Sequence, residues 1–282
     1  MSALSRRPAI EDPPWVRRAA IALALLAMGV LFLLPLVTVF TEALRRGFGA
    51  ALAAVAEPDA VAAIRLTLLV AVTAVPINML GGIAGAWCIA KFDFPGKRLL
   101  TTLIELPFSV SPVISGLVWV LLFGAQGLFG PWLRERGVEI VFALPGIVLA
   151  TVFVTFPFVA RTVIPLMQEQ GRGEEEAAIT LGASGWQAFR RVTLPNIHWA
   201  LLSGVLLCNA RAMGEFGAVA VVSGHVRGET NTMPLHVEIL YNEYQFVGAF
   251  AVAALLALLA LLTLVAKAAL ERLTGRRTDA LA

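Results

Sequence analysis

Charged residues are scarce in this sequence. They make up 15% of the 282 residues, against 59% hydrophobic residues, whereas a soluble domain carries about 25% charged residues. The formal net charge is only +3, and the Lys and Arg residues lie between apolar runs rather than in one block. These features disfavour a nucleic-acid-binding protein and indicate that water is not the main solvent of the chain.

Residues that build metal or covalent sites are also few. Cys88 and Cys208 both fall inside apolar segments without a CxxC spacing, so we expect neither a disulfide nor a zinc site. The three histidines form no H-E-x-x-H pattern. Gly96 and Lys97 do not belong to a phosphate-binding loop, because Arg98 stands where Ser or Thr is required. The sequence therefore predicts no catalytic residue, no metal ligand and no cofactor bound by this chain.

Long apolar runs recur along the chain instead. Each is about 20 residues or longer, enough to cross a hydrocarbon core of about 30 Å as a helix, and the first is too long for a signal-peptide core. We predict an all-α integral membrane protein with about six transmembrane helices. The predicted spans are residues 19–41, 60–90, 99–123, 144–167, 196–222 and 244–270.

The positive residues predict the orientation of these spans. With the N-terminus inside, the cytoplasmic segments hold 14 Lys and Arg residues and the outer segments hold five. Because positive residues are retained on the cytoplasmic face, we expect a multi-pass protein with both termini in the cytoplasm. The prediction divides the chain into a cytoplasmic N-terminal segment, 1–18, a transmembrane domain, 19–270, and a cytoplasmic tail, 271–282.

A long polar stretch, 168–195, lies between the fourth and fifth predicted spans on the cytoplasmic side. Glu174 to Glu176 suit the N-terminal end of a short helix, and Gly182 is expected to end it. Ser184 and Gln187 form a capping-box pattern for a second short helix, which Pro195 is expected to stop. Such a helix-turn-helix can dock on a partner or pack on its own bundle.

Within this loop, the pattern Glu176-Ala177-Ala178, three residues, Gly182, nine residues, Val192-Thr193-Leu194-Pro195 resembles the EAA signature of permease subunits of binding-protein-dependent ABC importers. The resemblance implies a type I importer bundle in a bacterial-type inner membrane, in which this loop couples to a separate ATPase. We therefore call residues 168–195 the coupling loop. The family most often has Ile where this chain has Val192, a mild departure. The resemblance assigns ATPase-coupling roles to Glu176, Ala177, Ala178, Gly182, Leu194 and Pro195.

Further segments resemble the oxyanion-transporting branch of that family. They are residues 107–116, 211–218, 222–224, 228–230 and 235–241, and among them Gly-Glu-Phe-Gly and Gly-Glu-Thr resemble the W-type subunit of sulfate/thiosulfate permeases. The resemblance implies transport of sulfate or thiosulfate, with molybdate or tungstate as the alternative. The implied partners are the lipid bilayer, a second homologous permease subunit, two ATP-binding subunits that hold ATP–Mg, and an extracytoplasmic sulfate/thiosulfate-binding protein.

Charged residues inside the predicted spans are candidates for the translocation path, because such charges usually face a bundle interior or an aqueous cavity. Arg211 and Glu215 are four residues apart and can pair on one helix face, so a structural pair and a path role both stay open. Arg211 can offer several donors to an oxyanion. Together with the resembling segments, this gives the candidate path residues Arg211, Gly214, Glu215, Gly217 and Ser111.

A second pair of charges lies nearer the cytoplasm. Glu105 and Arg161 are each about two turns from the cytoplasmic end of their spans. Their matching depth leads us to expect a structural ion pair between adjacent helices, with a gate or substrate role as the alternative.

Two other classes of function remain open. A secondary transporter driven by an ion gradient would need no coupling loop and would usually show a repeated half, whereas this sequence shows no repeat of 20 to 50 residues. A membrane scaffold would explain the polar loop as a docking site without transport.

Overall fold

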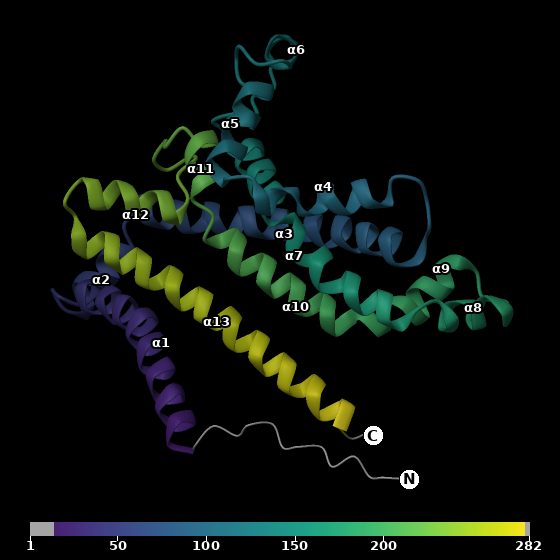
Figure 1. The fold of residues 1–282 in the computed structure, drawn as a ribbon. Helices are drawn as coiled ribbons and strands as arrows, with labels where there is room; N and C mark the ends of the chain where they lie inside the picture. The colour runs from purple at the N-terminus through teal and green to yellow at the C-terminus, as the bar shows by residue number, and fades with distance from the viewer. Residues whose placement is uncertain (1–13, 280–282) are drawn as a thin grey trace.

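The computed structural model describes residues 14–279, with side chains up to Leu270. Residues 1–13 of the predicted N-terminal segment and 280–282 of the predicted tail lie outside the described residues. The regular elements of the described part are all helices, as predicted (Figure 1). In chain order they are α1 Pro14–Ala43, α2 Phe48–Val55, α3 Pro58–Lys91, α4 Lys97–Ser109, α5 Pro112–Phe123, α6 Gly130–Glu135, α7 Leu144–Gln170, α8 Gly173–Thr180, α9 Gly185–Ala188, the π-helical turn η1 Phe189–Thr193, α10 Leu194–Met213, α11 Gly217–Val222, α12 Met233–Asn242 and α13 Phe246–Asp279.

Five helices of the described chain are long and apolar enough to span a membrane. They are α1, α3, α7, the continuous helix Gly185–Met213, and Phe246–Leu270 of α13. A sixth span is present if α4 and α5, which are bent by 109°, count as one. The predicted number of about six is therefore confirmed, but two of the predicted spans have a different form.

The predicted third span, 99–123, is not one straight helix. α4 ends at Ser109, and α5 begins at Pro112 after Val110 and Ser111, which have extended backbone with ψ of 133°. Proline lacks an N–H and disfavours helical backbone at the residue before it, so the helix breaks at Ser111. Beyond the break, α5 runs toward α6 (Figure 1).

The predicted fifth span, 196–222, begins and ends elsewhere. α9, η1 and α10 form one helix from Gly185 to Met213, so Pro195 does not stop the second short helix as predicted. The wider turn of η1, which ends two residues before Pro195, accommodates a residue that lacks an N–H. The span ends before Gly214, and the residues from Gly217 onward form the separate helix α11.

The centre of the bundle is made by α3, α7 and α10. A small residue brings α3 close to α7, because a side chain at Gly82 would meet Cβ of Val159 at 2.8 Å. The amide of Asn78 on α3 donates to the Thr155 hydroxyl on α7 at 2.7 Å and lies 3.5 Å from Sγ of Cys208 on α10. Buried polar contacts of this kind fix which helix faces meet, so the three helices pack as one unit.

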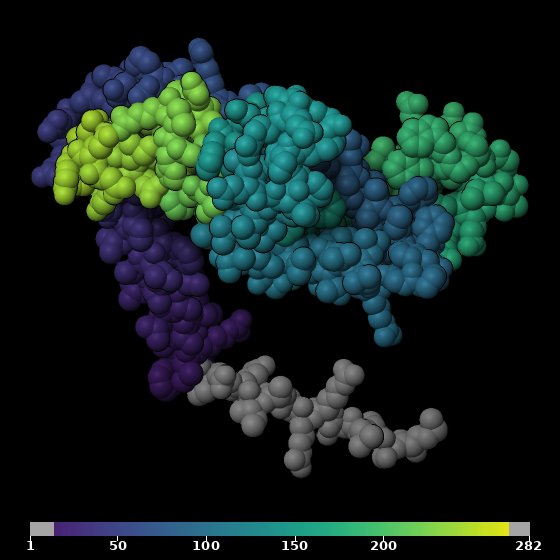
Figure 2. Space-filling model, turned by 90° about the horizontal axis from the view of Figure 1, so that it is seen from above, coloured from purple at the N-terminus to yellow at the C-terminus, as the bar shows by residue number. Residues whose placement is uncertain are grey.

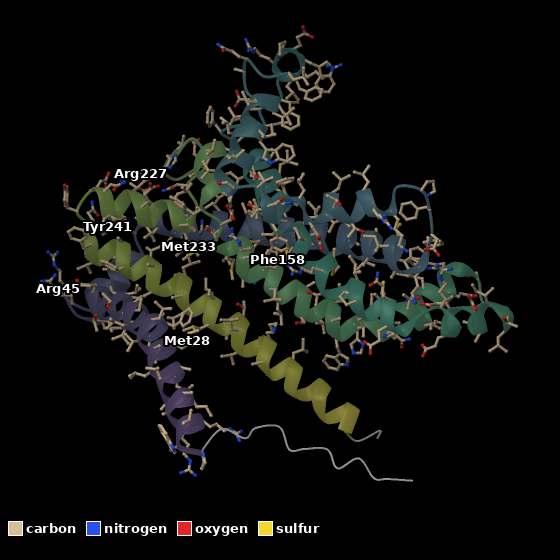
Figure 3. The ribbon with its side chains drawn as sticks, in the orientation of Figure 1. Met28, Arg45, Phe158, Arg227, Met233 and Tyr241 are labelled. Atoms are coloured by element: carbon tan, nitrogen blue, oxygen red, sulfur yellow. The ribbon has the colours of Figure 1, made fainter. Side chains whose placement is uncertain are left out.

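The two ends of the molecule differ in content. α8 and α9 project at one end (Figures 1 and 2). Arg45, Arg227 and Tyr241 lie at the opposite end, near α2 and the junction of α12 with α13 (Figure 3). Arg45 and Arg227 belong to the five basic residues predicted on the outer side, so the structure separates them from the coupling loop along the bundle axis.

The first span lies at the edge of the bundle. The C-terminal end of α1 packs on the first turns of α13, where Ala43 meets Ala251 and Ala254. The most apolar stretch of α1 is otherwise exposed. This surface fits a lipid or protein environment rather than water.

Candidate functional site

The coupling loop folds as the predicted helix-turn-helix. α8 is followed by a turn at Gly182, whose φ is +92°. The Gly182 N–H donates to the Ile179 carbonyl at 2.9 Å, and the Ala183 N–H donates to the Ala178 carbonyl at 3.0 Å. These two bonds are the common glycine termination of a helix, and glycine adopts the required positive φ at least cost.

The second short helix begins with the predicted capping box. The Gln187 N–H donates to the Ser184 hydroxyl at 3.3 Å, and the Ser184 N–H donates to the Gln187 side-chain oxygen at 2.8 Å. The two bonds satisfy N–H groups that have no partner within the helix. The capping box at Ser184 is therefore confirmed.

An apolar patch lies at the tip of the loop. It consists of Ile179, Leu181 and Trp186, which are 54%, 89% and 69% exposed, and we call it the tip patch. Trp186 stacks on Phe189 with ring centroids 5.5 Å apart, and Phe189 in turn contacts Trp87 of α3 at 5.2 Å. Exposed large apolar side chains of this kind are typical of surfaces that contact another protein or a membrane.

A buried lysine ties the loop to the spanning helices. The ammonium of Lys91, at the end of α3, lies 2.8 Å from a carboxylate oxygen of Glu175 in α8. The same ammonium donates to the Gly171 carbonyl, and Glu175 accepts from the Thr193 hydroxyl at 2.9 Å. Lys91 is only 7% exposed, so this charge-assisted cluster is stronger than a surface ion pair. It joins α3, α8 and η1 at one carboxylate.

A second link lies beside the first on the surface. Asp93, just after α3, accepts from Lys97 at 2.9 Å and from Arg172 at 3.0 Å. These two cations, Lys97 foremost, hold the pKa of Asp93 below its ordinary value. Because the carboxylate is exposed, the contact orients the loop more than it stabilises the fold.

The predicted ATPase-coupling residues all lie on this loop, but they differ in exposure. Ala178 and Leu194 are half-buried, and Leu194 packs against the core between α7 and α10. The other four are exposed, namely Glu176, Ala177, Gly182 and Pro195. Sequence reasoning missed Lys91 and Glu175, which hold the loop in place.

Two helix breaks meet beside the core. α5 packs along α11, where a side chain at Gly116 would lie 2.6 Å from the carbonyl oxygen of Ala218. At the break itself, a side chain at Gly217 would meet Cβ of Pro112 at 3.0 Å. The predicted path residues Ser111, Gly214 and Gly217 therefore lie at two breaks that are in contact with each other.

Arg211 and Glu215 form the pair that their spacing allows. The guanidinium lies 2.8 Å from one carboxylate oxygen of Glu215, and the other oxygen accepts from the Ala218 N–H at 3.0 Å. The Glu215 side chain is 1% exposed, whereas Arg211 is 35% exposed. Glu215 thus links the end of α10 to the first turn of α11, where the helix dipole favours a negative charge. Part of the Arg211 side chain remains accessible.

Glu105 and Arg161 line one cavity between α4 and α7, of about 390 Å³. In the described chain no salt bridge within 4 Å joins these two residues, so the structure does not form the predicted ion pair. The Arg161 guanidinium instead lies over the ring of Phe108, 5.4 Å from its centre. Phe108 also packs on Phe158 with ring centroids 5.2 Å apart.

Comparison with known proteins places these features in a family. Residues 77–277 match the family described as binding-protein-dependent transport system inner membrane component. The chain is 52% identical over 242 residues to the sulfate transport system permease protein CysW of Escherichia coli K12, covering 86% of this chain and 83% of that protein. It is 50% identical over 260 residues to the CysW protein of Synechocystis sp., covering 92% and 94%. It is 34% identical over 254 residues to the sulfate transport system permease protein CysT of Escherichia coli K12, covering 90% and 92%.

Solved structures share the fold. A chain of a bacterial alginate ABC transporter, crystallised in complex with an alginate pentasaccharide-bound periplasmic protein, superposes with a TM-score of 0.74 at 16% identity, covering 90% of this chain and 92% of that one. The sequence match spans most of the chain, and the relatives are similar over nearly their whole length. This chain belongs to the family of binding-protein-dependent transport system inner membrane components.

Proposed function

We propose that this chain is a permease subunit of an ATP-driven sulfate or thiosulfate importer and forms half of its translocation path. The observation that carries the proposal is the loop of α8 and α9, which presents the tip patch and is tied into the spanning helices through Lys91. A loop built in this way docks on another protein and passes its motion to the bundle. The relatives named as sulfate transport system permeases supply the substrate class.

The proposed path passes the two helix breaks. Backbone groups freed at Ser111 and Gly214 need protein, water or solute partners, and the accessible part of Arg211 can donate to an oxyanion. Pairing with Arg211 neutralises Glu215, which would otherwise repel the solute. The exposed apolar side chains of α5 suit contact with a second homologous permease; they are Val113, Ile114, Leu117, Val118 and Leu121.

The proposed importer also includes other subunits. ATP–Mg would be bound by two ATPase subunits that contact the tip patch, and a soluble sulfate/thiosulfate-binding protein would deliver the anion from outside. The complex would lie in the inner membrane with both termini of this chain in the cytoplasm. The distance of Arg45 and Arg227 from the coupling loop supports this orientation (Figure 3).

The test is reconstitution of this chain in vesicles with the partner permease, the ATPase and the binding protein. ATP-dependent uptake of radiolabelled sulfate is measured with and without excess molybdate, and a complex that omits this chain is the control. Uptake that requires this chain and ATP and resists molybdate supports the proposal. Suppression by molybdate would move the substrate to the molybdate/tungstate branch. Failure to associate with any ATPase would favour the secondary-transporter or scaffold functions instead.

A further inference from the structure

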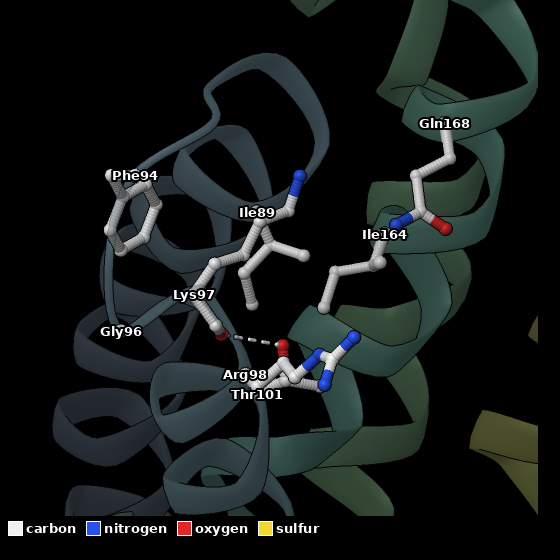
Figure 4. A pocket seen from close by; sticks show the side chains of 8 residues that line it. All are labelled: Ile89, Phe94, Gly96, Lys97, Arg98, Thr101, Ile164 and Gln168. Atoms are coloured by element: carbon white, nitrogen blue, oxygen red, sulfur yellow. Dashed lines mark hydrogen bonds between the residues drawn. The ribbon is translucent and has the colours of Figure 1, made fainter.

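Two cavities adjoin along the seam between α4 and α7. One, of about 390 Å³, holds Arg161 and Glu105, as described above. The other, of about 640 Å³, opens nearer the coupling loop and is lined by Ile89, Phe94, Gly96, Lys97, Arg98, Thr101, Ile164 and Gln168. Figure 4 shows Ile164 and Gln168 of α7 on one side of this second cavity and Phe94 and Lys97 on the other. Thr101 of the second cavity and Glu105 of the first are four residues apart on α4, and so lie on one helix face. Ile164 and Arg161, three residues apart on α7, are related in the same way, so the two cavities follow one another along the seam.

The charges along this seam are mainly positive. Lys97, Arg98 and Arg161 face the two cavities, against the single carboxylate of Glu105. Within the described chain, neither Arg98 nor Arg161 has a carboxylate within 4 Å. Lys97 is paired with Asp93, which lies outside both cavities. The seam therefore has cationic groups whose charge is not cancelled by the fold.

Arg161 lies inside the spanning helix α7 rather than at its end. It lies nine residues before the end of α7 at Gln170, which is about 13 Å along the helix. Both Arg161 and Glu105 are exposed on this chain. A charge at this depth faces water or protein rather than hydrocarbon, so the seam fits a water-filled passage.

We propose that the α4–α7 seam is the inner half of the anion path, in which a tetrahedral oxyanion is held first by Arg161 and then by Arg98. The inference rests on the proposed function and extends it to named positions. The Gln168 amide supplies a further donor along the way. The Thr101 and Thr102 hydroxyls donate to the backbone carbonyls of Lys97 and Arg98 and are not free to hold the anion. Glu105 competes with the anion for Arg161, and weak binding at several sites allows the anion to leave. Release then occurs beside the coupling loop. Lys97, which lines the second cavity, and Arg172 of that loop both pair with Asp93, so the cavity and the loop are neighbours.

The test is a charge-selective labelling experiment on the assembled importer. Thr102→Cys is introduced into a Cys88→Ala, Cys208→Ala background, and its rates of modification by a negatively and a positively charged methanethiosulfonate reagent are compared. We expect the negative reagent to be favoured and sulfate to slow the reaction. Arg161→Gln should lower the rate ratio roughly fivefold, and Glu105→Gln should raise it by a similar factor. Arg134→Gln, on the short helix α6, should leave it unchanged, and Leu262→Cys on the exposed face of α13 should not react.

Opposite shifts for the two charge variants would not arise from a merely structural role. The seam proposal would be overturned if Thr102→Cys does not react, or if neither Arg161→Gln nor Glu105→Gln changes the rate ratio, while the background complex still takes up sulfate. Absence of ATP-dependent sulfate uptake in that background complex would instead refute the proposed function.

Discussion

Lys91 at the end of α3 and Glu175 in α8 form an ion pair of 2.8 Å whose side chains are only 6% and 18% exposed. The two residues are 84 positions apart in the chain, and their contact joins a spanning helix directly to the loop that carries the tip patch. A push on that loop therefore reaches α3 as well as α7 and α10.

We expect Lys91→Met to uncouple transport from ATP hydrolysis. The substitution leaves the Glu175 carboxylate half-buried without its cation, which costs about 3 kcal/mol in the local stability of the loop. Sulfate uptake per ATP hydrolysed by the reconstituted complex should fall several-fold. Arg45→Met is the matched control, because Arg45 pairs with Glu42 on the surface at 3.4 Å and such a pair contributes less than about 1 kcal/mol. Equal coupling in the two variants would contradict the anchoring role of Lys91.

Gly182→Ala should weaken docking of the ATPase without disturbing the bundle. A side chain at Gly182 meets nothing within 4 Å, so the cost comes from its φ of +92° alone and is about 1–2 kcal/mol. Gly182→Asp adds a charge beside the tip patch and should abolish coupling while the protein still inserts. Gly185→Ala, three residues on and equally open, lacks the positive φ and should behave like the unmodified chain. Docking is measured as the amount of ATPase that co-purifies with each variant. Identical amounts for Gly182→Ala and Gly185→Ala would argue against a role of the Gly182 turn in docking.

Gly116→Ala should force α5 away from α11. The added Cβ would lie 2.6 Å from a backbone oxygen, which cannot move as a side chain can, so we expect a loss of about 1–3 kcal/mol. Gly29→Ala, on α1, meets nothing within 4 Å and serves as the control. The readout is the melting temperature of the detergent-solubilised protein, which should fall for Gly116→Ala alone. Equal melting temperatures would mean that α5 and α11 are not in close contact at Gly116.

Arg211→Gln separates the two roles of Arg211. The single variant leaves Glu215 buried and unpaired, which is expected to cost about 3–5 kcal/mol. Adding Glu215→Gln should restore most of the melting temperature, because an amide can still accept from the Ala218 N–H. If Arg211 also contacts the anion, sulfate uptake by the double variant stays low. Recovery of both stability and uptake would reduce the pair to a structural element.

The protein should lose stability as the pH falls below about 6.5, through His236. Burial lowers the pKa of this side chain, partly offset by Asp59. The folded state therefore keeps His236 neutral where the unfolded chain takes up a proton, so acid favours unfolding. Melting temperatures of the unmodified chain and of His236→Gln, compared between pH 7.5 and 5, should show the smaller drop for the variant. An equal drop would assign the acid sensitivity to other groups.

Much of the architecture could be predicted from the sequence because the length of an apolar run is a local property. The same is true of the capping box at Ser184 and of the turn at Gly182, whose determinants lie within a few residues. The break at Ser111 has its signal in Pro112, but a proline does not reveal whether a helix kinks slightly or turns by 109°.

Contacts between distant residues could not be predicted in the same way. Glu105 and Arg161 have matching depth, but depth fixes position along the membrane normal only and leaves the facing of each helix undetermined. In the sequence, Lys91 is a charge at the end of an apolar run, and Glu175 is one of three consecutive glutamates. Their meeting depends on how α3, α7 and η1 pack, which no local pattern contains.

The uninterrupted helix Gly185–Met213 has a mechanical consequence. Its 29 residues form a shaft of about 44 Å with Trp186 near one end and Arg211 near the other. A rigid helix transmits rotation as well as displacement. The angle about the helix axis between the tip patch and the Arg211 side chain is therefore fixed. Each residue added to a helix turns everything beyond it by about 100°. The wide turn of η1 therefore contributes to this angle. A one-residue insertion there would leave both ends folded but would rotate one end by about 100° relative to the other.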